Sequence, residues 1–222
     1  MDNFLTGRAR SLGAGLRALL VLTLLTGVLY PLAVTGAAQL LFSDRANGSE
    51  VRADGRVVGS SLIGQPYTLP LKKGQETPEP DLRWFQGRPA AGLGTNSENT
   101  RYSLLLSGAT NLAADNKVLV QRVADAKAAV VRDNSVPGHP VRSADVPADA
   151  VTSSGSGLDP DISPEYARLQ THRVAARNHL SVAEVARIVR EHTEGRTLGF
   201  LGEPRVDVLA LNSALRDLAA RP

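Results

Sequence analysis

Cysteine is absent from this chain of 222 residues, and aromatic side chains make up only 4% of it. Without cysteine there is no disulfide framework, no thiolate-bound metal and no cysteine nucleophile. An excess of one charge sign is also missing, because 25 lysines and arginines face 22 aspartates and glutamates. A formal net charge of +3 is too small for a polyanion-binding protein, so we expect no nucleic acid among its partners.

The sequence also lacks the short motifs of common catalytic sites. It contains no Gly-Lys-Ser/Thr, which excludes a Walker-type phosphate-binding loop. Gly155-Ser156-Gly157 lacks the outer glycines of a nucleophile elbow. The four histidines form no His-Glu-x-x-His array, and His172 and His179, seven residues apart, make a poor zinc site by themselves. We therefore predict no catalytic residue and no metal for this chain.

Charged side chains are missing between Arg17 and Asp44, where the sequence is almost entirely apolar. A helix needs about 20 apolar residues to cross a bilayer core of roughly 30 Å, and this stretch is long enough. We predict a cytoplasmic tail over residues 1–14, a transmembrane helix over 15–42 and a second domain over 43–222.

The two flanks of this span differ in charge, which predicts its orientation. Arg8, Arg10 and Arg17 precede it with a single acidic residue. These are three of the 25 basic residues and one of the 22 acidic ones, which leaves a nearly neutral 22 and 21 beyond residue 43. The positive-inside rule therefore predicts a single-pass protein of the cell (inner) membrane, with a cytoplasmic N-terminus and an extracytoplasmic domain.

A cleaved signal peptide is the alternative to a permanent anchor. The small residues from Val34 to Ala38 could host a signal peptidase site, and cleavage would release a secreted hydrolase or ligand-binding domain. However, the apolar run continues to Phe42 and exceeds the ~7–15 residues of a signal-peptide core. The length of the run favours the anchor.

One side of the predicted span carries a stripe of residues at helical spacing, namely Thr23, Gly27, Tyr30, Val34 and Ala37. Lipid provides no hydrophobic drive for helix association, so membrane helices pack where small residues allow close approach. The same residues are also tolerated in a helix that faces only lipid. Pro31 lies beside the stripe and cannot donate a hydrogen bond to Gly27, which predicts a kink and favours docking on another membrane helix.

The rest of the chain mixes helical and strand patterns and shows no internal repeat. Apolar spacing and capping residues predict helices over about 116–133, from Ser163 towards His179, from Ser181 to Gly195 and over 212–219. Alternation and turn residues predict short strands at 56–63, 82–85, 198–201 and 205–210. This mixture predicts an α+β fold.

The most distinctive run of this domain is Val-Thr-Ser-Ser-Gly-Ser-Gly-Leu-Asp-Pro, over residues 151–160. Successive serine and glycine backbones that lead to a helix N-terminus can form an anion-binding nest. The alternative is a glycine-rich turn with an Asp-Pro cap. Several residues separate the serine- and glycine-rich part, Ser153–Gly157, from the helix cap at Ser163, which favours the turn.

Several segments, taken in order behind the N-terminal span, resemble one protein family. They are Gly59–Gln65, Trp84–Ala90, Ser107–Leu112, Val151–Pro160, Gln170, Arg173–Arg177, Gly199–Val206 and Leu209–Asn212. With these motifs the sequence resembles the KdpC family, one of the subunits of the Kdp potassium-transporting P-type ATPase. Asp207 stands where the family pattern has asparagine, and Ala109-Thr110 replace a Gly-Ser pair.

The resemblance implies a non-catalytic accessory subunit of a high-affinity, ATP-driven potassium uptake complex. The implied partners are the lipid bilayer and two other subunits of the Kdp complex, one potassium-channel-like and one ATP-hydrolysing. The family is described as stabilising the assembly and, in the role of catalytic chaperone, raising the ATP affinity of the pump subunit. No cofactor of its own is implied, and ATP enters only through the complex. The proposed nucleotide role is linked to Ser153, Ser154, Gly155, Ser156, Gly157 and Gln170.

The predicted topology conflicts with a direct contact between ATP and these residues. ATP is cytosolic, whereas the charge asymmetry predicts Ser153–Gly157 and Gln170 on the other side of the bilayer. We therefore expect the span to dock on partner helices and the domain to cap the mouth of the channel-like partner. Differential contacts with the states of the pump would then bias its cycle. A nucleotide-binding regulator with a cytosolic domain is the alternative under reversed topology.

Overall fold

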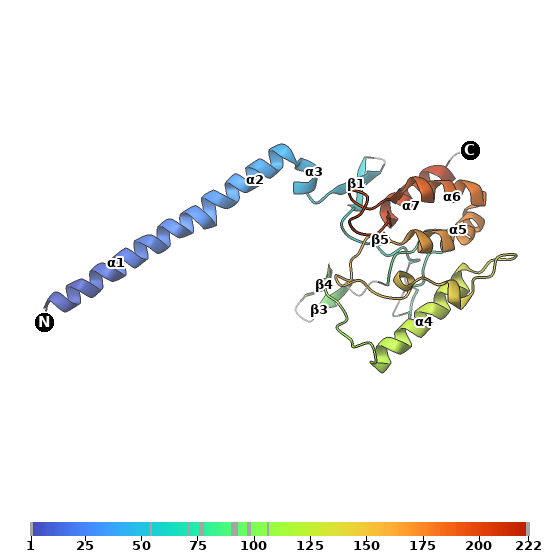
Figure 1. Ribbon diagram of the computed structural model, residues 1–222, viewed down its shortest axis with the longest axis horizontal. Helices are drawn as coiled ribbons and strands as arrows, with labels where there is room; N and C mark the ends of the chain where they lie inside the picture. The colour runs from blue at the N-terminus through green and yellow to red at the C-terminus, as the bar shows by residue number, and fades with distance from the viewer. Residues whose placement is uncertain are drawn as a thin grey trace. The chain divides into compact units, whose positions relative to one another are not determined.

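A computed structural model of the chain describes residues 2–53, 55–70, 72–75, 78–89, 93–96, 99–105 and 107–220. The chain divides into two compact units, Met1–Glu50 and Val51–Pro222. The first unit is helical, and the second combines helices with short strands (Figure 1). The predicted α+β class, with one long apolar helix at the N-terminus, is confirmed.

The first unit runs from helix α1 (Asp2–Leu24) through a π-helical turn η1 (Leu25–Leu29) into helix α2 (Tyr30–Leu41) and the short helix α3 (Ser43–Ala46). Within it, residues Arg8–Leu41 are long and apolar enough to cross a membrane. None of the apolar window in this stretch is buried. In this respect it differs from the core helix of a water-soluble domain, which hides its apolar face.

The helix accommodates Pro31 through the π-helical turn that precedes it. Proline has no N–H, so the α-helical hydrogen bond that would end on it is lost. The turn instead closes with a bond from the Tyr30 N–H to the Leu25 carbonyl oxygen. The Thr26 hydroxyl donates to the Leu22 carbonyl at 2.7 Å. This bond lies about one turn before the carbonyl that Pro31 leaves free.

The π-helical turn also interrupts the spacing of the predicted docking stripe. One π turn inserts an extra residue into an α-helix, so the residues after it are rotated about the helix axis relative to those before it. Thr23 precedes the turn, Gly27 lies within it, and Tyr30, Val34 and Ala37 follow. The stripe therefore has two sections that face different directions, and its docking role stays a prediction.

The second unit contains four long helices in its described part: α4 (Lys117–Asn134), α5 (Pro164–Asn178), α6 (Val182–Glu191) and α7 (Val208–Ala219). Two strand pairs are β1 (Glu50–Ala53) with β2 (Arg56–Ser60), and β3 (Leu93–Asn96) with β4 (Asn99–Leu105). A three-stranded antiparallel sheet has the order β5 (Asp161–Ile162), β7 (Arg205–Asp207), β6 (Thr193–Glu194).

The helices begin where capping residues satisfy their first N–H groups. Ser163 accepts from the Tyr166 N–H at 3.0 Å, and Ser181 forms a complete capping box with Glu184. Asp207 caps α7 by accepting from the Ala210 N–H at 2.6 Å. Asparagine caps equally well, so the departure from the family pattern at position 207 leaves this cap intact.

Two predicted strands were wrong in part and two were wrong entirely, and the helix predicted from Ser181 to Gly195 ends at Glu191. The strand predicted at 205–210 ends at Asp207, because the Asp207 cap starts α7 at Val208, four residues before the predicted helix. Residues 56–63 form a strand only as far as Ser60. Residues 82–85 and 198–201 form no strand, since their backbones bond to side chains and to a turn, respectively.

The core of the second unit lies around α5 and α7. Ala167 and Val174 of α5 and Leu211 and Leu215 of α7 are fully buried. Phe85 joins them from the loop before β3. The N-terminal half of α4, in contrast, stays at the surface, and of its predicted apolar face only Val130 is buried. The core is therefore built on aliphatic side chains, as the low aromatic content predicts.

Candidate functional site

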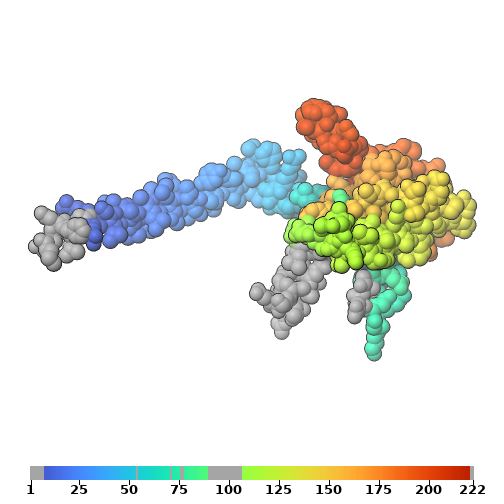
Figure 2. All heavy atoms as spheres, turned by 60° about the horizontal axis from the view of Figure 1, so that its bottom comes forward, coloured from blue at the N-terminus to red at the C-terminus, as the bar shows by residue number. Residues whose placement is uncertain are grey.

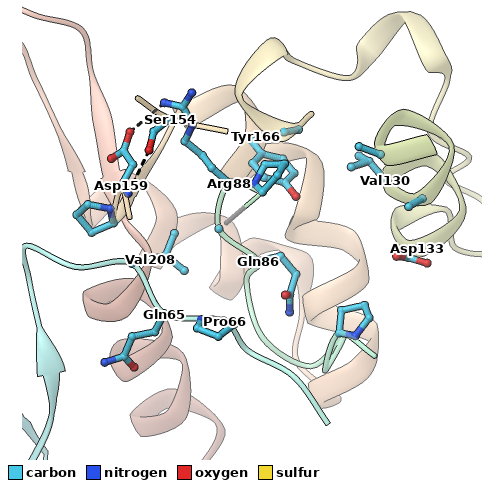
Figure 3. A pocket seen from close by; sticks show the side chains of 18 of the residues that line it. Gln65, Pro66, Gln86, Arg88, Val130, Asp133, Ser154, Asp159, Tyr166 and Val208 are labelled. Carbon is cyan, nitrogen blue, oxygen red and sulfur yellow. Dashed lines mark hydrogen bonds and ion pairs between the residues drawn. The ribbon is translucent and has the colours of Figure 1, made fainter. Parts of the chain in front are cut away.

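Segments far apart in the sequence meet at one cavity in the second unit. The cavity has a volume of about 290 Å³, and its walls come from residues 64–66, 86–89, 154 and 157–160 together with α4 and α5. Arg88 and Asp159 meet beside Ser154 on one side, while Val130 and Asp133 of α4 lie on the other (Figure 3). Four of the runs that carry the family resemblance therefore share this cavity, because Arg173 lines it as well.

Arg173 of α5 is the most buried charged residue of the site, with 1% of its surface exposed. Its guanidinium donates to the carbonyl oxygens of Leu82 and Trp84, to Asn134 Oδ1 at 2.9 Å and to Gln170 Oε1 at 2.6 Å. Burial lowers the pKa of Arg173 to about 10, so it remains charged at neutral pH. All of these acceptors are uncharged, so the cation has no ion-pair partner among them.

Two buried side-chain amides bond to the backbones of Phe85 and Gln86, which follow Trp84 in the same loop. Asn212 accepts from the Phe85 N–H at 2.9 Å and donates to the Phe85 carbonyl at 3.0 Å. Gln170 does the same for Gln86, at 2.7 and 2.9 Å. A side-chain amide offers one acceptor and donors, as a peptide group of a neighbouring strand would. The backbone of this loop is therefore bonded without a neighbouring strand, although residues 82–85 resemble a strand in the sequence.

The position of Gln170 limits what it can bind. It is fully buried, and both ends of its amide are engaged by backbone and by Arg173. A nucleotide contact would have to break these bonds and leave buried partners unsatisfied, at about 1–3 kcal/mol for each group. Gln170 does not line the cavity. Its nucleotide role stays a prediction, while its geometry is that of a residue that holds the loop 82–86 in place.

The serine- and glycine-rich run folds as a turn that is held by hydrogen bonds between its own residues. The Ser156 hydroxyl accepts from the Leu158 N–H at 3.1 Å, and the Ser154 hydroxyl accepts from the Asp159 N–H at 3.4 Å. Gly157, with φ +68°, donates its N–H to the Ser154 carbonyl. An anion nest needs free N–H groups, and those of residues 157–159 are already used.

Of the predicted nucleotide residues, the structure brings Ser154 and Gly157 to the cavity wall. Ser153, Gly155 and Ser156 lie in the same turn but do not line the cavity, and a side chain at Gly155 would meet no atom within 4 Å. The turn therefore presents only part of the predicted set to the cavity.

Other motif residues fasten this turn from two sides. Arg88 forms an ion pair with Asp159, 2.9 Å from Nη1 to Oδ2. The Gly64 N–H donates to the Leu158 carbonyl at 2.7 Å. A Cβ atom at Gly64 would lie 2.5 Å from the Asp159 carbonyl oxygen, so only glycine fits this close approach. No local pattern in the sequence signals these contacts, since each joins residues more than 70 positions apart.

Burial also shifts the pKa values of acidic groups at the edge of the site. Asp161 and Asp207 face each other across the β5–β7 pair. Burial is the largest cause that raises the pKa of Asp161 to about 6, opposed by Arg205 at 3.3 Å and reinforced by Asp207. Tyr166, which lines the cavity, has its pKa raised to about 12 by burial and is a neutral hydroxyl.

The histidines do not pair as their spacing in the sequence suggests. His172 stacks on His139, with ring centroids 3.6 Å apart and planes 10° from parallel, and not on His179. Burial, and secondly His139, lowers the pKa of His172. Within the described residues no group of three or more histidine or acidic side chains could hold a metal ion.

Taken together, these bonds hold in place the loops that surround the cavity. The hydrogen bonds and ion pairs at the cavity join side chains to backbone or, at Arg173 and at the Arg88–Asp159 pair, to other side chains. No buried side-chain polar atom lacks a partner in the described part of the chain. The cavity lies at the lower end of the roughly 300–1,000 Å³ typical of ligand pockets. Its size suits a small group better than a nucleoside triphosphate.

Comparison with known proteins adds a direct result. Residues 12–217 match the family model described as KdpC: K⁺-transporting ATPase, c chain. A relative from Streptomyces avermitilis, named as a potassium-transporting ATPase KdpC subunit, is 73% identical over 220 residues and covers 99% of both chains. Relatives of the same name from Gemmatimonas aurantiaca and Mycobacterium tuberculosis are 47% and 42% identical, over 92% and 93% of this chain and 94% and 97% of theirs.

Proposed function

Because the chain belongs to the KdpC family of K⁺-transporting ATPase subunits, we propose that it assembles and stabilises a high-affinity potassium uptake complex without catalysing a reaction itself. The partners in this proposal are the potassium-channel-like and the ATP-hydrolysing subunits of the complex. The family match over nearly the whole chain carries the proposal. The site supports it, because its polar side chains are engaged in holding loops.

The proposal includes the role of catalytic chaperone, in which this chain raises the ATP affinity of the ATP-hydrolysing partner. We propose that it does so through protein contacts and not by holding ATP at Gln170. The full engagement of the Gln170 amide supports this choice. In this proposal the chain needs no cofactor of its own, and ATP is bound elsewhere in the complex.

We also propose that Arg8–Leu41 is a permanent single-pass anchor with its N-terminus in the cytoplasm. The length of the apolar helix and the arginines on one flank support it. The experiment is to introduce a cysteine at Ser156, which is unique because the chain has none, and to treat intact cells with an impermeant thiol reagent. Labelling is expected, together with an intact N-terminal mass in purified membranes. Protection from the reagent, or a mature chain that begins near Ala38, would overturn this topology.

Docking of the anchor on a partner helix is proposed to use Thr23 and Gly27. A Cβ at Gly27 would meet only the Thr23 side chain, at 3.8 Å, so this surface is open to a neighbour. Replacing both with leucine (Thr23→Leu, Gly27→Leu) should release the chain from the purified complex, because close approach is lost. Gly36→Leu is the matched control, since it adds bulk away from this pair. Unchanged assembly of the double variant contradicts the docking proposal.

A further inference from the structure

The segment between β6 and β7 forms a projecting turn that the site does not use. Thr197 and Leu201 exchange two backbone hydrogen bonds of 2.9 Å, and the Gly199 N–H donates to the Arg196 carbonyl at 3.0 Å. In Figure 2 the residues around position 200, in orange-red, stand out from the body of the second unit. The turn is held by its own hydrogen bonds and is therefore a defined structure.

Three adjoining apolar side chains, Leu198, Phe200 and Leu201, occupy this turn, and we call them the apolar tip. Leu198 is 79% and Phe200 68% exposed, more than any other large apolar side chain described in the second unit. Single exposed apolar residues are common, whereas three of them gathered in one short turn point to an interaction site.

The backbone of the apolar tip is one that leucine rarely adopts. Leu198 has φ +54°, followed by Gly199 with φ +82°. Glycine and asparagine take this left-handed conformation readily, whereas a branched side chain is disfavoured in it. The turn therefore holds a leucine at an exposed position at the expense of backbone strain, and strain of this kind accompanies functional contacts.

The charges beside the apolar tip are balanced, which indicates what surface it fits. Arg196 pairs with Glu203 at 2.7 Å, and Arg205 pairs with Glu194 at 2.7 Å. These four are all the charged residues between positions 193 and 206. An anionic lipid surface would be met by unpaired lysines and arginines, often with tryptophan, and this stretch has neither. Three side chains also fall short of the ~800 Å² per partner of a stable interface, so the apolar tip needs a larger contact around it whichever protein it meets.

We propose that the apolar tip inserts into an uncharged, apolar recess on another subunit of the potassium-transporting ATPase. It would act as a central anchor within a larger contact, in which a few buried side chains supply most of the binding. This inference rests on the proposed role of the chain in assembly, and it names a contact region for that role outside the membrane helix.

Photo-crosslinking in the intact complex tests the occupant directly. Phe200 is replaced by p-benzoylphenylalanine in the full chain, the complex is irradiated in native membranes, and the adduct is identified by mass. Covalent linkage to another subunit of the ATPase is expected. The same amino acid at Val120, exposed on α4, is the control site. An adduct with lipid alone, with a second copy of this chain alone, or no adduct beyond the control, would overturn the proposal.

A second variant tests the contribution of the apolar tip without disturbing the turn. Leu198→Asn suits the left-handed backbone, and Phe200→Gln removes the second apolar group, so the melting temperature should stay the same or rise. We expect at least a tenfold loss of affinity for the rest of the complex, measured by titrating the purified variant against complex that lacks this chain. Val118→Gln with Val120→Gln removes exposed apolar surface from α4 instead and should change the affinity less than twofold.

Different results would contradict the assembly function and the anchoring role of the apolar tip. If wild-type chain does not bind the rest of the complex, the assembly function is wrong. If wild type binds and the Leu198→Asn, Phe200→Gln variant binds equally well, the assembly function stands and the apolar tip is not an anchor.

Discussion

The two units of the chain place their apolar side chains in opposite environments. In the first unit none of the described side chains from position 8 onward is buried, and leucines such as Leu20 and Leu32 are more than half exposed. In the second unit, aliphatic residues from α5, α6 and α7 form a closed core. Because exposed apolar surface is unfavourable in water, the first unit requires lipid or a partner helix, whereas the second supplies its own apolar surroundings.

The units also differ in the range of the interactions that define them. The long helix is set by residues within one or two turns of each other, including the π turn before Pro31. The site of the second unit depends on bonds such as Gln86 to Gln170 and Phe85 to Asn212, which join residues 84 and 127 positions apart. A local change should therefore act locally in the first unit and spread through several loops in the second.

The largest expected effect on the stability of the second unit, with the first unit unchanged, comes from Arg173→Ala. It would remove all the donors that bind Leu82, Trp84, Asn134 and Gln170, and would leave buried acceptors without partners. We expect the free energy of unfolding to fall by about 3–5 kcal/mol. Denaturant titration of the full chain in detergent measures this loss.

The control for this variant is Arg168→Ala on the same helix, whose ion pair with Glu165 is exposed. It should cost less than about 1 kcal/mol. Membrane insertion of both variants should equal that of wild type. If Arg173→Ala costs no more than its control, the buried network does not hold the site.

A smaller effect is expected at Gly64, where a methyl group would press on the Asp159 carbonyl oxygen. Gly64→Ala should destabilise the second unit by roughly 1–3 kcal/mol, because backbone has to move. Gly155→Ala is the matched control in the neighbouring turn, where nothing lies within 4 Å and φ is not positive. It should leave the melting temperature unchanged or slightly higher. Equal effects at the two positions would show that the close approach at Gly64 carries no energetic weight.

The smallest effect concerns pH. The pKa of Asp161 is about 6 in the folded chain, above its value of about 3.9 when unfolded, so the folded state binds the proton more tightly. Its contribution to stability is therefore full below about pH 4 and is lost as pH rises through about 6. Melting curves between pH 4 and 8 should show a decline that is shallower by about 1–2 kcal/mol in Asp161→Asn. Asp145→Asn, at an exposed ion pair, should leave the slope of stability against pH as in wild type. A slope that changes in Asp145→Asn and not in Asp161→Asn would refute the burial of Asp161.

The comparison of sequence with structure separates elements that local chemistry specifies from those it does not. The caps at Ser163 and Ser181 were predicted, because a helix start needs only a side-chain oxygen and N–H groups three residues away. The predicted strands agree less well with the structure than the predicted helix caps. Residues 82–85 have strand-like composition, but their bonds go to the buried side chains of Arg173 and Asn212. No local pattern announces such partners.

The candidate site shows the same division. The run 151–160 stands out in the sequence, and its interpretation as a turn agrees with the bonds that Ser154 and Ser156 make within it. Gln170 was assigned to the same set through family resemblance, and only the fold shows that it is buried behind the loop 82–86. The apolar tip was predicted as a strand, because alternation cannot distinguish a strand from a turn with two left-handed residues.

The amino-acid sequence by itself determined the long apolar helix, the helix caps, the α+β class and the family, since each depends on spacing within a few residues or on order along the chain. The tertiary structure decided which polar residues are buried, which motifs share the cavity and which apolar side chains are left at the surface. The physical reason is that burial and hydrogen-bond partnership are properties of pairs, and the partners of a side chain are chosen only when distant segments pack together.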